Sequence, residues 1–389
     1  MDGRRLTGRL TAALVTGALV GGLMAAPAAA QDEVDLEAWK ALLFEGGEFT
    51  TDPNYQGANE GGTIGYMNAG DFPAGPLPWL SIRSPESREI AYSIFNSAWP
   101  LPVAYAERGK LDGECMGVNV TTYTNEADAA KGLQNAELMV QNGTDFAINL
   151  QIYPDVNDQI AEMFEAEGIG QVYYAVPPET STQPFVVLPD YSTGFDLGVY
   201  LGEYARDNWD GQVDLVLLVG QEQAGPVPAL RMAGGVAGIE SVLGEIPDDK
   251  IATVDTGTGT LEEARQAVAD FITSRPDVQY ILLPGFDDVK SVGAIRALEA
   301  AGKAEFAAAS GLPGTPEGLD ELRKGPGGSA FKVSAVQDLA FASWLVALGI
   351  YALEGGELPD VSAFKAVQVT AENIEALPSQ TSEGYTCAS

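Results

Sequence analysis

Histidine is missing from all 389 residues of this chain. Histidine is the usual general base near neutral pH and the commonest metal ligand in proteins. Its absence excludes Ser-His-Asp and Cys-His nucleophile systems, and the two cysteines present are too few for a zinc cluster. Walker, GxGxxG, GxSxG, HExxH and EF-hand patterns are also missing. We therefore expect no cofactor, no metal and no enzymatic activity.

Basic residues are scarce as well. The chain has 21 Lys and Arg against 55 Asp and Glu, which gives a net charge of −34. Nucleic acid and anionic lipid surfaces are therefore poor partners. The acids are spread throughout the chain, so we interpret them as a solvated surface suited to a salty habitat. A cationic substrate is the alternative.

The N-terminus has the pattern of a secretory signal peptide. Residues 1–30 combine three arginines, the apolar stretch "TAALVTGALVGGLMAA" and the small-residue ending "APAAA" before Gln31. A retained membrane anchor is the alternative, but spanning a bilayer needs about 20 apolar residues. We expect residues 1–30 to be removed during export.

The two cysteines are Cys115, which we place at the entry to a strand, and Cys387, in the polar tail "PSQTSEGYTCAS". In an exported protein they could form one disulfide that pins the C-terminus. The alternative is a half-buried Cys115 beside a free Cys387. Spacing does not decide between them, because the geometry of the fold does.

From residue 89 onward, short apolar segments alternate with helical patterns. Strands are predicted at 89–95, 115–123, 144–150, 171–176, 185–188, 213–220, 251–256, 278–285 and 304–310. This alternation is typical of parallel sheets covered by helices on both faces, and two sheets of about five strands fit the length. Residues 31–88, rich in Gly, Pro and Asn, are predicted to be an N-terminal extension of mostly irregular structure.

Two adjacent acids, Asp287 and Asp288, follow the apolar segment "YILLPGF". In open parallel sheets, ligands bind beyond the carboxyl ends of the strands. We expect one of these aspartates to cap the next helix and the other to contact a ligand. The sequence does not say which is which.

Four segments in order carry a resemblance to a known family: "GQVDLVLLVGQEQAGPVPALRMAGGVAGIES", "ARQAVADFITSRPDVQYILLPGFDDVKSVGAIRALEAAG", "GTPEGLDELRKG" and "FKVSAVQDLAFASWLVALGIYALEGG". Together they resemble the type I periplasmic binding proteins, in particular the ribose/galactose-type receptors of sugar ABC importers. The resemblance covers roughly residues 89–375.

The resemblance implies an α/β fold of two doubly wound parallel-sheet lobes, joined by three crossovers that act as a hinge. Lobe one would take residues 89–189 and 338–364. Lobe two would take residues 190–337 and 365–389, including the C-terminal tail.

The resemblance also implies a set of ligand-binding residues. The family's loop after the first strand matches "FNSAWP", with Asn96, Ser97 and Trp99, whose ring suits the C–H face of a sugar or a methylated cation. The family's R-x-x-G motif places an arginine at Arg231, and its Asn-Asp pair matches Asp287 and Asp288.

Two further positions lie at the crossovers. The family's strand-to-hinge glutamine matches Gln337, and the aspartate at the first crossover matches Asp190, which we expect to be a hinge element. Two customary acceptors are missing: "YYAVPP" replaces an Asp-Arg pair, and Pro313 replaces an aspartate. These departures disfavour an ordinary pentose or hexose, and they leave a modified sugar, a polyol or another small polar molecule as the ligand.

By resemblance, the function is capture of a small polar ligand in an interlobe cleft and delivery to an inner-membrane ABC permease. We expect a monomer located in the periplasm. The alternative is a ligand sensor that presents its bound form to a sensor kinase or chemoreceptor, with residues 31–88 as a docking surface.

Overall fold

The computed structural model describes residues 34–51, 55, 59, 61–70, 77–97, 100–151, 153–174, 176–179, 183–221, 226–257 and 259–377. The expected signal peptide, Trp99 and Cys387 lie outside these residues. Asp35–Ser389 form one compact unit. Among the described residues, no helix has the length and apolar character needed to cross a membrane.

The first sheet contains seven strands among the described residues, in the order β1-β12-β6-β5-β4-β2-β3, and its pairings are parallel. The strands are β1 (Ile64–Tyr66), β2 (Glu89–Ile94), β3 (Asn119–Thr124), β4 (Phe146–Asn149), β5 (Gly170–Tyr174), β6 (Phe185–Val187) and β12 (Val361–Ala363).

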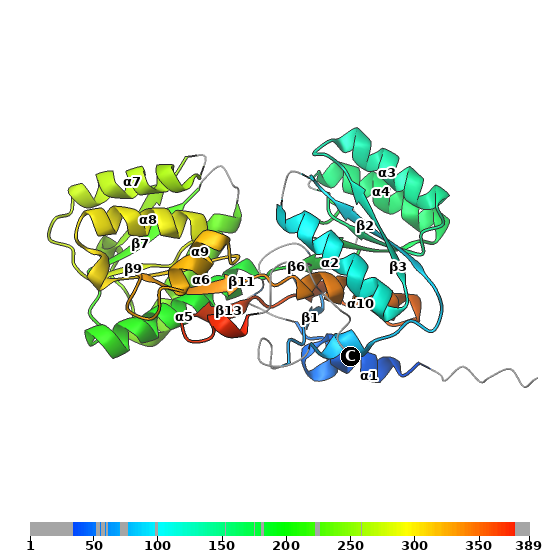
Figure 1. Cartoon of the computed structure of the whole chain (residues 1–389), viewed down its shortest axis with the longest axis horizontal. Helices are drawn as coiled ribbons and strands as arrows, with labels where there is room; N and C mark the ends of the chain where they lie inside the picture. Colours follow the sequence, from blue (N-terminus) through cyan, green and yellow to red (C-terminus); the bar gives the residue numbers. More distant parts are fainter. Residues whose placement is uncertain are drawn as a thin grey trace, which may run out of the picture. The chain divides into compact units, whose positions relative to one another are not determined.

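Helices cover both faces of the first sheet (Figure 1). On one face lie α2 (Pro100–Met116) and α10 (Ala340–Leu353), and on the other lie α3 (Ala129–Gln141) and α4 (Pro154–Glu167). The alternation along β2 explains this: Ile90 and Tyr92 are buried in one hydrophobic cluster, and Ala91 is buried in the other. Both faces of the strand are therefore apolar, as parallel sheets require.

The second sheet contains six strands among the described residues, in the order β13-β11-β10-β9-β7-β8. They are β7 (Leu215–Gly220), β8 (Ile251–Asp255), β9 (Ile281–Leu283), β10 (Ala307–Gly311), β11 (Phe331–Val336) and β13 (Val367–Thr370), of which β13 runs antiparallel to β11. Figure 1 shows α5 (Asp190–Trp209) and α6 (Pro226–Leu243) on one side, with α7 (Leu261–Thr273), α8 (Asp288–Ala300) and α9 (Pro316–Leu322) on the other.

The chain passes between the two sheets three times. It leaves the first sheet after β6, returns after β11 through α10 and β12, and leaves again between β12 and β13. The predicted α/β fold with two parallel-sheet lobes and three crossovers is thereby confirmed. The expected five strands per sheet were too few, because β1, β12 and β13 have only three or four residues and show no periodicity.

Residues 31–88, expected to be mostly irregular, contain in chain order the helix α1 (Leu36–Leu43), the short 3-10 helix η1 (Glu45–Gly47), the strand β1 and the 3-10 helix η2 (Pro78–Ser81). The side chain of Asp35 caps α1 by accepting a hydrogen bond from the backbone N–H of Ala38. The indole of Trp344 in α10 donates to the carbonyl of Leu43, and the indole of Trp79 donates to Oγ of Ser343. The described part of the extension is therefore packed onto α10 by buried contacts.

The strand predicted at 115–123 begins later, at Asn119, because Cys115 and Met116 form the last turn of α2. Gly117 follows with a positive φ of 87°, which suits a glycine that ends a helix. Cys115 is disulfide-bonded. Since Cys387 lies outside the described residues, the Cys115–Cys387 bridge stays a prediction.

Candidate ligand site

Asp287 is the N-cap of α8. Its Oδ1 accepts a hydrogen bond from the backbone N–H of Lys290 at 2.8 Å, and its Oδ2 pairs with the Lys290 ammonium at 2.6 Å. The Asp287 side chain is 19% exposed and the Lys290 side chain is 5% exposed. The prediction that one of the two adjacent aspartates caps this helix is confirmed, and the capping carboxylate is also held by a buried cation.

Asp288 is fully buried. Its carboxylate accepts hydrogen bonds from the backbone N–H groups of Gly314 and Thr315, at 2.7 and 2.5 Å, and from Oγ of Ser334 at 2.8 Å. Burial raises the pKa of Asp288 to about 6, although these hydrogen bonds act in the opposite direction. Asp288 therefore anchors the loop after β10 and offers a ligand no exposed surface, which leaves Asp287 as the ligand candidate of the two.

Arg231, on α6, forms an ion pair with Asp190 at the start of α5. Its Nε lies 2.7 Å from Oδ1 of Asp190, and its Nη1 donates to the carbonyl of Phe286 at 3.3 Å. Burial raises the pKa of Asp190, and the charge of Arg231 opposes that shift. Asp190, predicted from sequence as a hinge element, also orients the predicted ligand-binding arginine.

The ring of Phe286 lies beside both cations of this region. The guanidinium carbon of Arg231 is 5.3 Å from the ring centroid, and Nζ of Lys290 is 4.9 Å from it. Sequence reasoning missed Phe286 and Lys290. The sequence did contain one signal for Lys290. It stands three residues after the capping Asp287, in the first turn of the helix, where the helix dipole disfavours a cation. We call Arg231, Asp190, Phe286, Asp287 and Lys290 the charged cluster.

Gln337 follows β11 directly. Its backbone N–H donates to the carbonyl of Pro313 at 2.9 Å, and its carbonyl accepts from the hydroxyl of Tyr105 at 3.3 Å. The Tyr105 ring packs against Tyr174 and Phe341. Burial raises the pKa of Tyr174, and the charge of Arg231 opposes this, so Arg231 acts electrostatically on the end of β5 as well.

Ser97 lies in the loop after β2 and is exposed. Its hydroxyl hydrogen-bonds to the carboxylate of Glu126, with both oxygens at 2.9 Å. Asn96 is half-buried, and Trp99 lies outside the described residues. The structure thus brings Arg231, Asp190 and Asp287 together, and no described hydrogen bond joins Ser97 to them.

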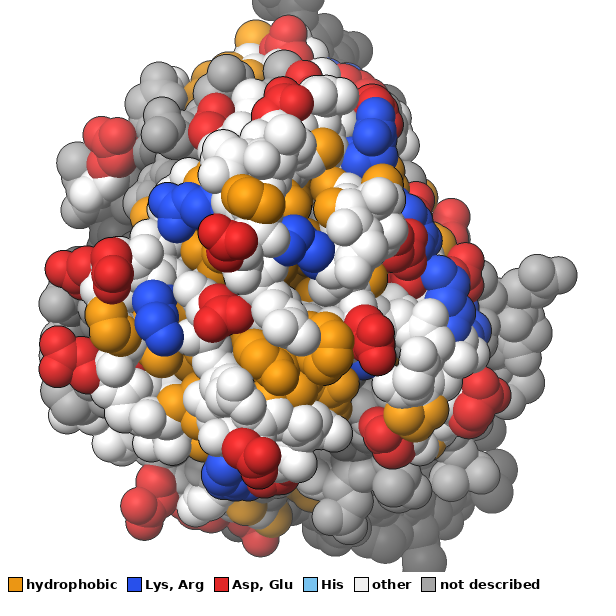
Figure 2. Space-filling model, turned by 90° about the vertical axis from the view of Figure 1, so that its left-hand side faces the viewer, with side chains coloured by type: hydrophobic (Ala, Val, Ile, Leu, Met, Phe, Trp, Pro, Cys, Tyr) orange, Lys and Arg blue, Asp and Glu red, His pale blue; other side chains and the backbone are white. Residues whose placement is uncertain are grey.

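A cavity of about 330 Å³ lies elsewhere, between β7, β8 and α6. Its lining is mainly apolar and includes Leu218, Pro228 and Met232, with Gln221 and Asp255 as polar members. Figure 2 shows the end of the molecule at the side of the second sheet, where acidic side chains are scattered among basic ones and hydrophobic side chains gather around a hollow. None of the predicted ligand residues that the structure describes is among the residues that line this cavity. Within the described ranges, no group of His, Cys, Asp or Glu could hold a metal ion.

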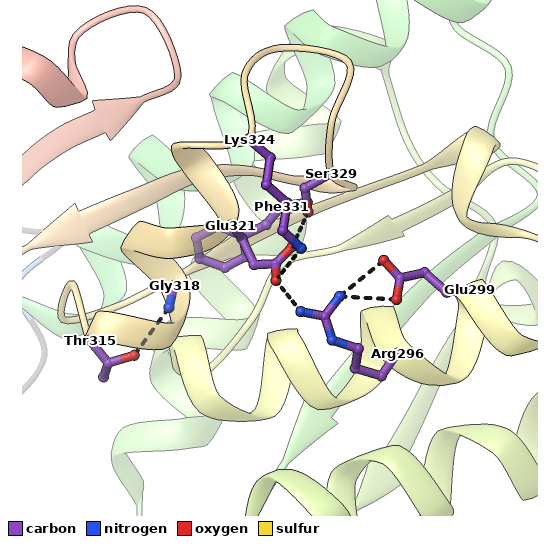
Figure 3. Close-up of polar contacts among 8 residues, drawn as sticks. All are labelled: Arg296, Glu299, Thr315, Gly318, Glu321, Lys324, Ser329 and Phe331. Carbon is purple, nitrogen blue, oxygen red and sulfur yellow. Dashed lines mark hydrogen bonds and ion pairs between the residues drawn. The ribbon is translucent and has the colours of Figure 1, made fainter.

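A second buried carboxylate, that of Glu321, holds together helices that cover the second sheet (Figure 3). Glu321 on α9, whose side chain is 2% exposed, pairs with Arg296 of α8 and with Lys324, and accepts from Ser329. Burial alone would raise the pKa of Glu321, but the hydrogen bonds from Lys324 and Ser329 and the charge of Arg296 outweigh it and lower the pKa. This cluster ties α9 to α8 and to the residues before β11.

Comparisons with known proteins identify the family. A model of the periplasmic binding protein domain matches residues 111–345. No curated protein matches the chain. Among solved structures, an ABC transporter solute-binding protein from Actinobacillus succinogenes with bound D-allose superimposes with a TM-score of 0.58 and 17% identity, over 74% of this chain and 99% of that one.

Two further solved structures agree in fold. A periplasmic ribose ABC transporter protein from Conexibacter woesei gives a TM-score of 0.60 at 18% identity, covering 76% of this chain and 95% of that one. A solute-binding protein from Bacillus halodurans with bound myo-inositol gives 0.53 at 19% identity, over 74% and 96%. The matched family and these neighbours are binding proteins, and the family implies a periplasmic location. The chain belongs to the periplasmic binding protein family.

Proposed function

We propose that this protein is a receptor that captures a small polar molecule of the sugar or polyol class and delivers it to an ABC importer. The observation that supports this most is the charged cluster, which gathers a half-buried arginine, an aromatic ring and a capping aspartate after the strands of the second sheet. In parallel sheets this is the edge where ligands bind. The solved neighbours include proteins with bound D-allose and myo-inositol, and both are polyhydroxyl compounds.

The roles of the residues follow from their donors and acceptors. Arg231, held by Asp190, presents its remaining N–H groups to ligand oxygens. Asp287 accepts from a ligand hydroxyl, and Gln337 offers an amide that both donates and accepts. We propose that Ser97 and Trp99 close the other side of the site when the two lobes move together about the three crossovers. No reaction is required of any of these groups.

Export is part of the same proposal. We propose that residues 1–30 are cleaved before Gln31 and that the mature receptor works in the periplasm as a monomer. N-terminal sequencing of the protein recovered from the periplasm tests the cleavage site, and its mass in solution tests the monomer. The partner would be the inner-membrane permease.

The alternative is a sensor that presents its ligand-bound form to a kinase or chemoreceptor. One observation supports this alternative: hydrogen bonds of Trp79 and Trp344 fix the described part of the extension on α10, so that part adds a surface to the first lobe. A permease encoded beside this gene would favour transport, and a sensor kinase would favour signalling. Uptake of labelled ligand with and without the protein separates the two directly.

The binding test is a thermal-shift panel of sugars, polyols and methylated amines, followed by calorimetry on any responder. A ligand at a hundredfold excess over its Kd stabilises the protein by about 2.7 kcal/mol, which gives a clear rise in melting temperature. One responding class within the sugars or polyols supports the proposal. A response from the methylated amines alone, or from no compound, contradicts it.

A further inference from the structure

A second cavity, which we call the hinge cavity, lies beside the three crossovers and has a volume of about 160 Å³. Its walls come from the start of α5, the end of β11, and the third crossover with β13. Tyr66, at the end of β1, adds a wall from the N-terminal extension. The polar residues of the lining are Tyr66, Ser192, Thr193, Asp196, Lys365 and Gln368. None of them belongs to the charged cluster, so the hinge cavity is a separate place in the molecule.

Several polar side chains of the hinge cavity lack a partner. Among the described residues, no hydrogen bond is made by the side chains of Ser192, Thr193, Asp196 and Gln368. Thr193 is buried, and Ser192 and Gln368 are half-buried. Polar groups in such positions are normally hydrogen-bonded to protein, water or a ligand. A concave site with convergent polar groups and some apolar lining, here Pro189, is the usual form of a binding site.

The donors and acceptors of the lining match hydroxyl groups. The hydroxyls of Ser192 and Thr193 and the amide of Gln368 both donate and accept, as a ligand hydroxyl does. The carboxylate of Asp196 accepts from such a hydroxyl. The ammonium of Lys365 already pairs with Glu45 of the extension at 2.5 Å, so its charge is compensated. An anionic ligand would therefore meet Asp196 without an unpaired cation to receive it.

The volume of the hinge cavity limits the size of its ligand. A protein cavity of about 150 Å³ holds benzene, a molecule of six non-hydrogen atoms. Glycerol also has six non-hydrogen atoms, whereas a hexose or a cyclitol has about twice as many. Asp196 and Lys365 are exposed, so a molecule can enter from solvent on their side. The cavity therefore suits a polyol of about three carbons better than a whole sugar.

We propose that the hinge cavity is a second binding site, which takes a small polyol of about three carbons. This inference does not rest on the proposed function, because it uses none of the residues of the charged cluster. The walls come from both sheets, with Tyr66 from the first and Ala335 and Gln368 from the second. A polyol that contacts both sets favours one relative position of the lobes. By linkage, it then also changes the affinity of the site at the charged cluster.

The test is hydrogen exchange, followed by mass spectrometry, on the full chain titrated with glycerol. We expect glycerol to slow exchange in peptides that span residues 188–193 and 364–368. The slowing should saturate with concentration and reach about tenfold at a tenfold excess over the Kd. Thr193→Val with Gln368→Met keeps the shape of the lining and removes two polar groups, so it should weaken glycerol binding by about tenfold or more. Gln266→Met, at an exposed glutamine of α7, is the matched control and should respond like wild type.

The double variant also controls for the effect of glycerol on the solvent. Equal slowing in the wild type and the double variant would mean that glycerol acts elsewhere, and would overturn the inference. Ethanolamine, a cation, and acetate, an anion, form two further arms. If either slows exchange at the crossovers and glycerol does not, the polyol class is wrong. If no compound has an effect, the hinge cavity is not a ligand site, and the receptor function is still decided by the thermal-shift panel. Where the double variant does not fold, Gln368→Met alone replaces it, because β13 lies at the edge of its sheet, and an unchanged glycerol response there would overturn the inference.

Discussion

Arg231 and Asp190 form a hydrogen-bonded ion pair of 2.7 Å between the helices α6 and α5. The two helices come close because glycines face each other across them. A Cβ placed on Gly194 of α5 would lie 2.1 Å from the carbonyl oxygen of Arg231. The backbone that carries Arg231 is thus fixed against α5, and its guanidinium is directed by Asp190 toward Phe286.

Replacing Arg231 by alanine should weaken ligand binding by about 2–4 kcal/mol, or roughly 30-fold to 1000-fold in Kd, because a buried charge-assisted contact is lost. Calorimetry with a responding compound of the panel measures this. Arg323→Ala is the matched control, since Arg323 is an exposed arginine paired with Asp320. An unchanged Kd for Arg231→Ala would show that Arg231 stabilises the packing of α5 against α6 and does not contact the ligand.

Removing the Asp288 side chain should destabilise the protein, because three donors lose their acceptor. Leaving buried donors unsatisfied costs about 1–3 kcal/mol each, less where water enters, so we expect a loss of about 3 kcal/mol or more for Asp288→Ala. Asp288→Asn should cost clearly less, since an amide oxygen can still accept from Gly314 and Thr315. Urea unfolding at neutral pH compares the two, and equal losses would contradict the assignment.

Asp288 should also make stability depend on pH in a direction opposite to that of most aspartates. Its pKa is about 6 in the folded protein and near the ordinary value of about 3.9 in the unfolded chain. Between these values the folded state holds more protons, so the stabilisation is complete below about pH 4 and is lost as the pH rises to about 6. The difference in unfolding free energy between wild type and Asp288→Asn isolates this dependence. A difference that stays constant from pH 4 to 7 would refute it.

Glu321 should show the reverse behaviour. Its folded pKa is lowered, so its contribution is present above the unfolded value of about 4.3 and is lost as the pH falls through the folded pKa. Glu321→Gln should destabilise the protein by about 1–3 kcal/mol at neutral pH, because the paired cations are partly exposed and recover some hydration. Glu299→Gln removes the exposed partner of the same arginine and should cost less than about 0.5 kcal/mol. Equal costs for the two variants would contradict the structural role of Glu321.

The alternation of strands and helices could be predicted from the sequence because it depends on local patterns of apolar and polar residues. Segments such as 213–220 are apolar on both faces, and amphipathic patterns follow them. The short strands could not be predicted in this way. β1 has three residues and pairs with β12, almost 300 residues later, so only the tertiary fold defines it.

Three members of the charged cluster, Arg231, Asp190 and Asp287, were named from the sequence, but their interactions with one another were not. Asp287 and Asp288 look alike in sequence, and only the fold brings the N–H groups of Gly314 and Thr315 to one of them. Lys290 was missed because a lysine in a predicted helix is normally assigned to the solvent-exposed face. Its burial depends on Phe286 and Asp287 together.

The extension should contribute to the stability of the first lobe. Trp79 is fully buried, and its indole donates to Oγ of Ser343 at 2.8 Å. Trp79→Ala should cost about 3–5 kcal/mol through the cavity it creates, and Trp79→Phe should cost less. Ser343→Ala combined with Trp79→Phe should cost less than the sum of the single changes if the hydrogen bond matters. A Trp79→Ala protein as stable as wild type would mean that the extension is only loosely attached.

The last prediction concerns the cysteines. Cys115 is disulfide-bonded and lies in the last turn of α2, and the sequence provides one other cysteine, Cys387. A bridge between them would close a loop of well over 200 residues. In the chain-entropy model such a loop is worth about 4–5 kcal/mol, and less if the tail melts locally in the reduced protein. We expect denatured, unreduced protein to show no free thiol and Cys387→Ser to lower the melting temperature to that of the reduced wild type. Two free thiols per chain would refute the bridge, and a covalent dimer on a non-reducing gel would show that Cys115 pairs between molecules instead.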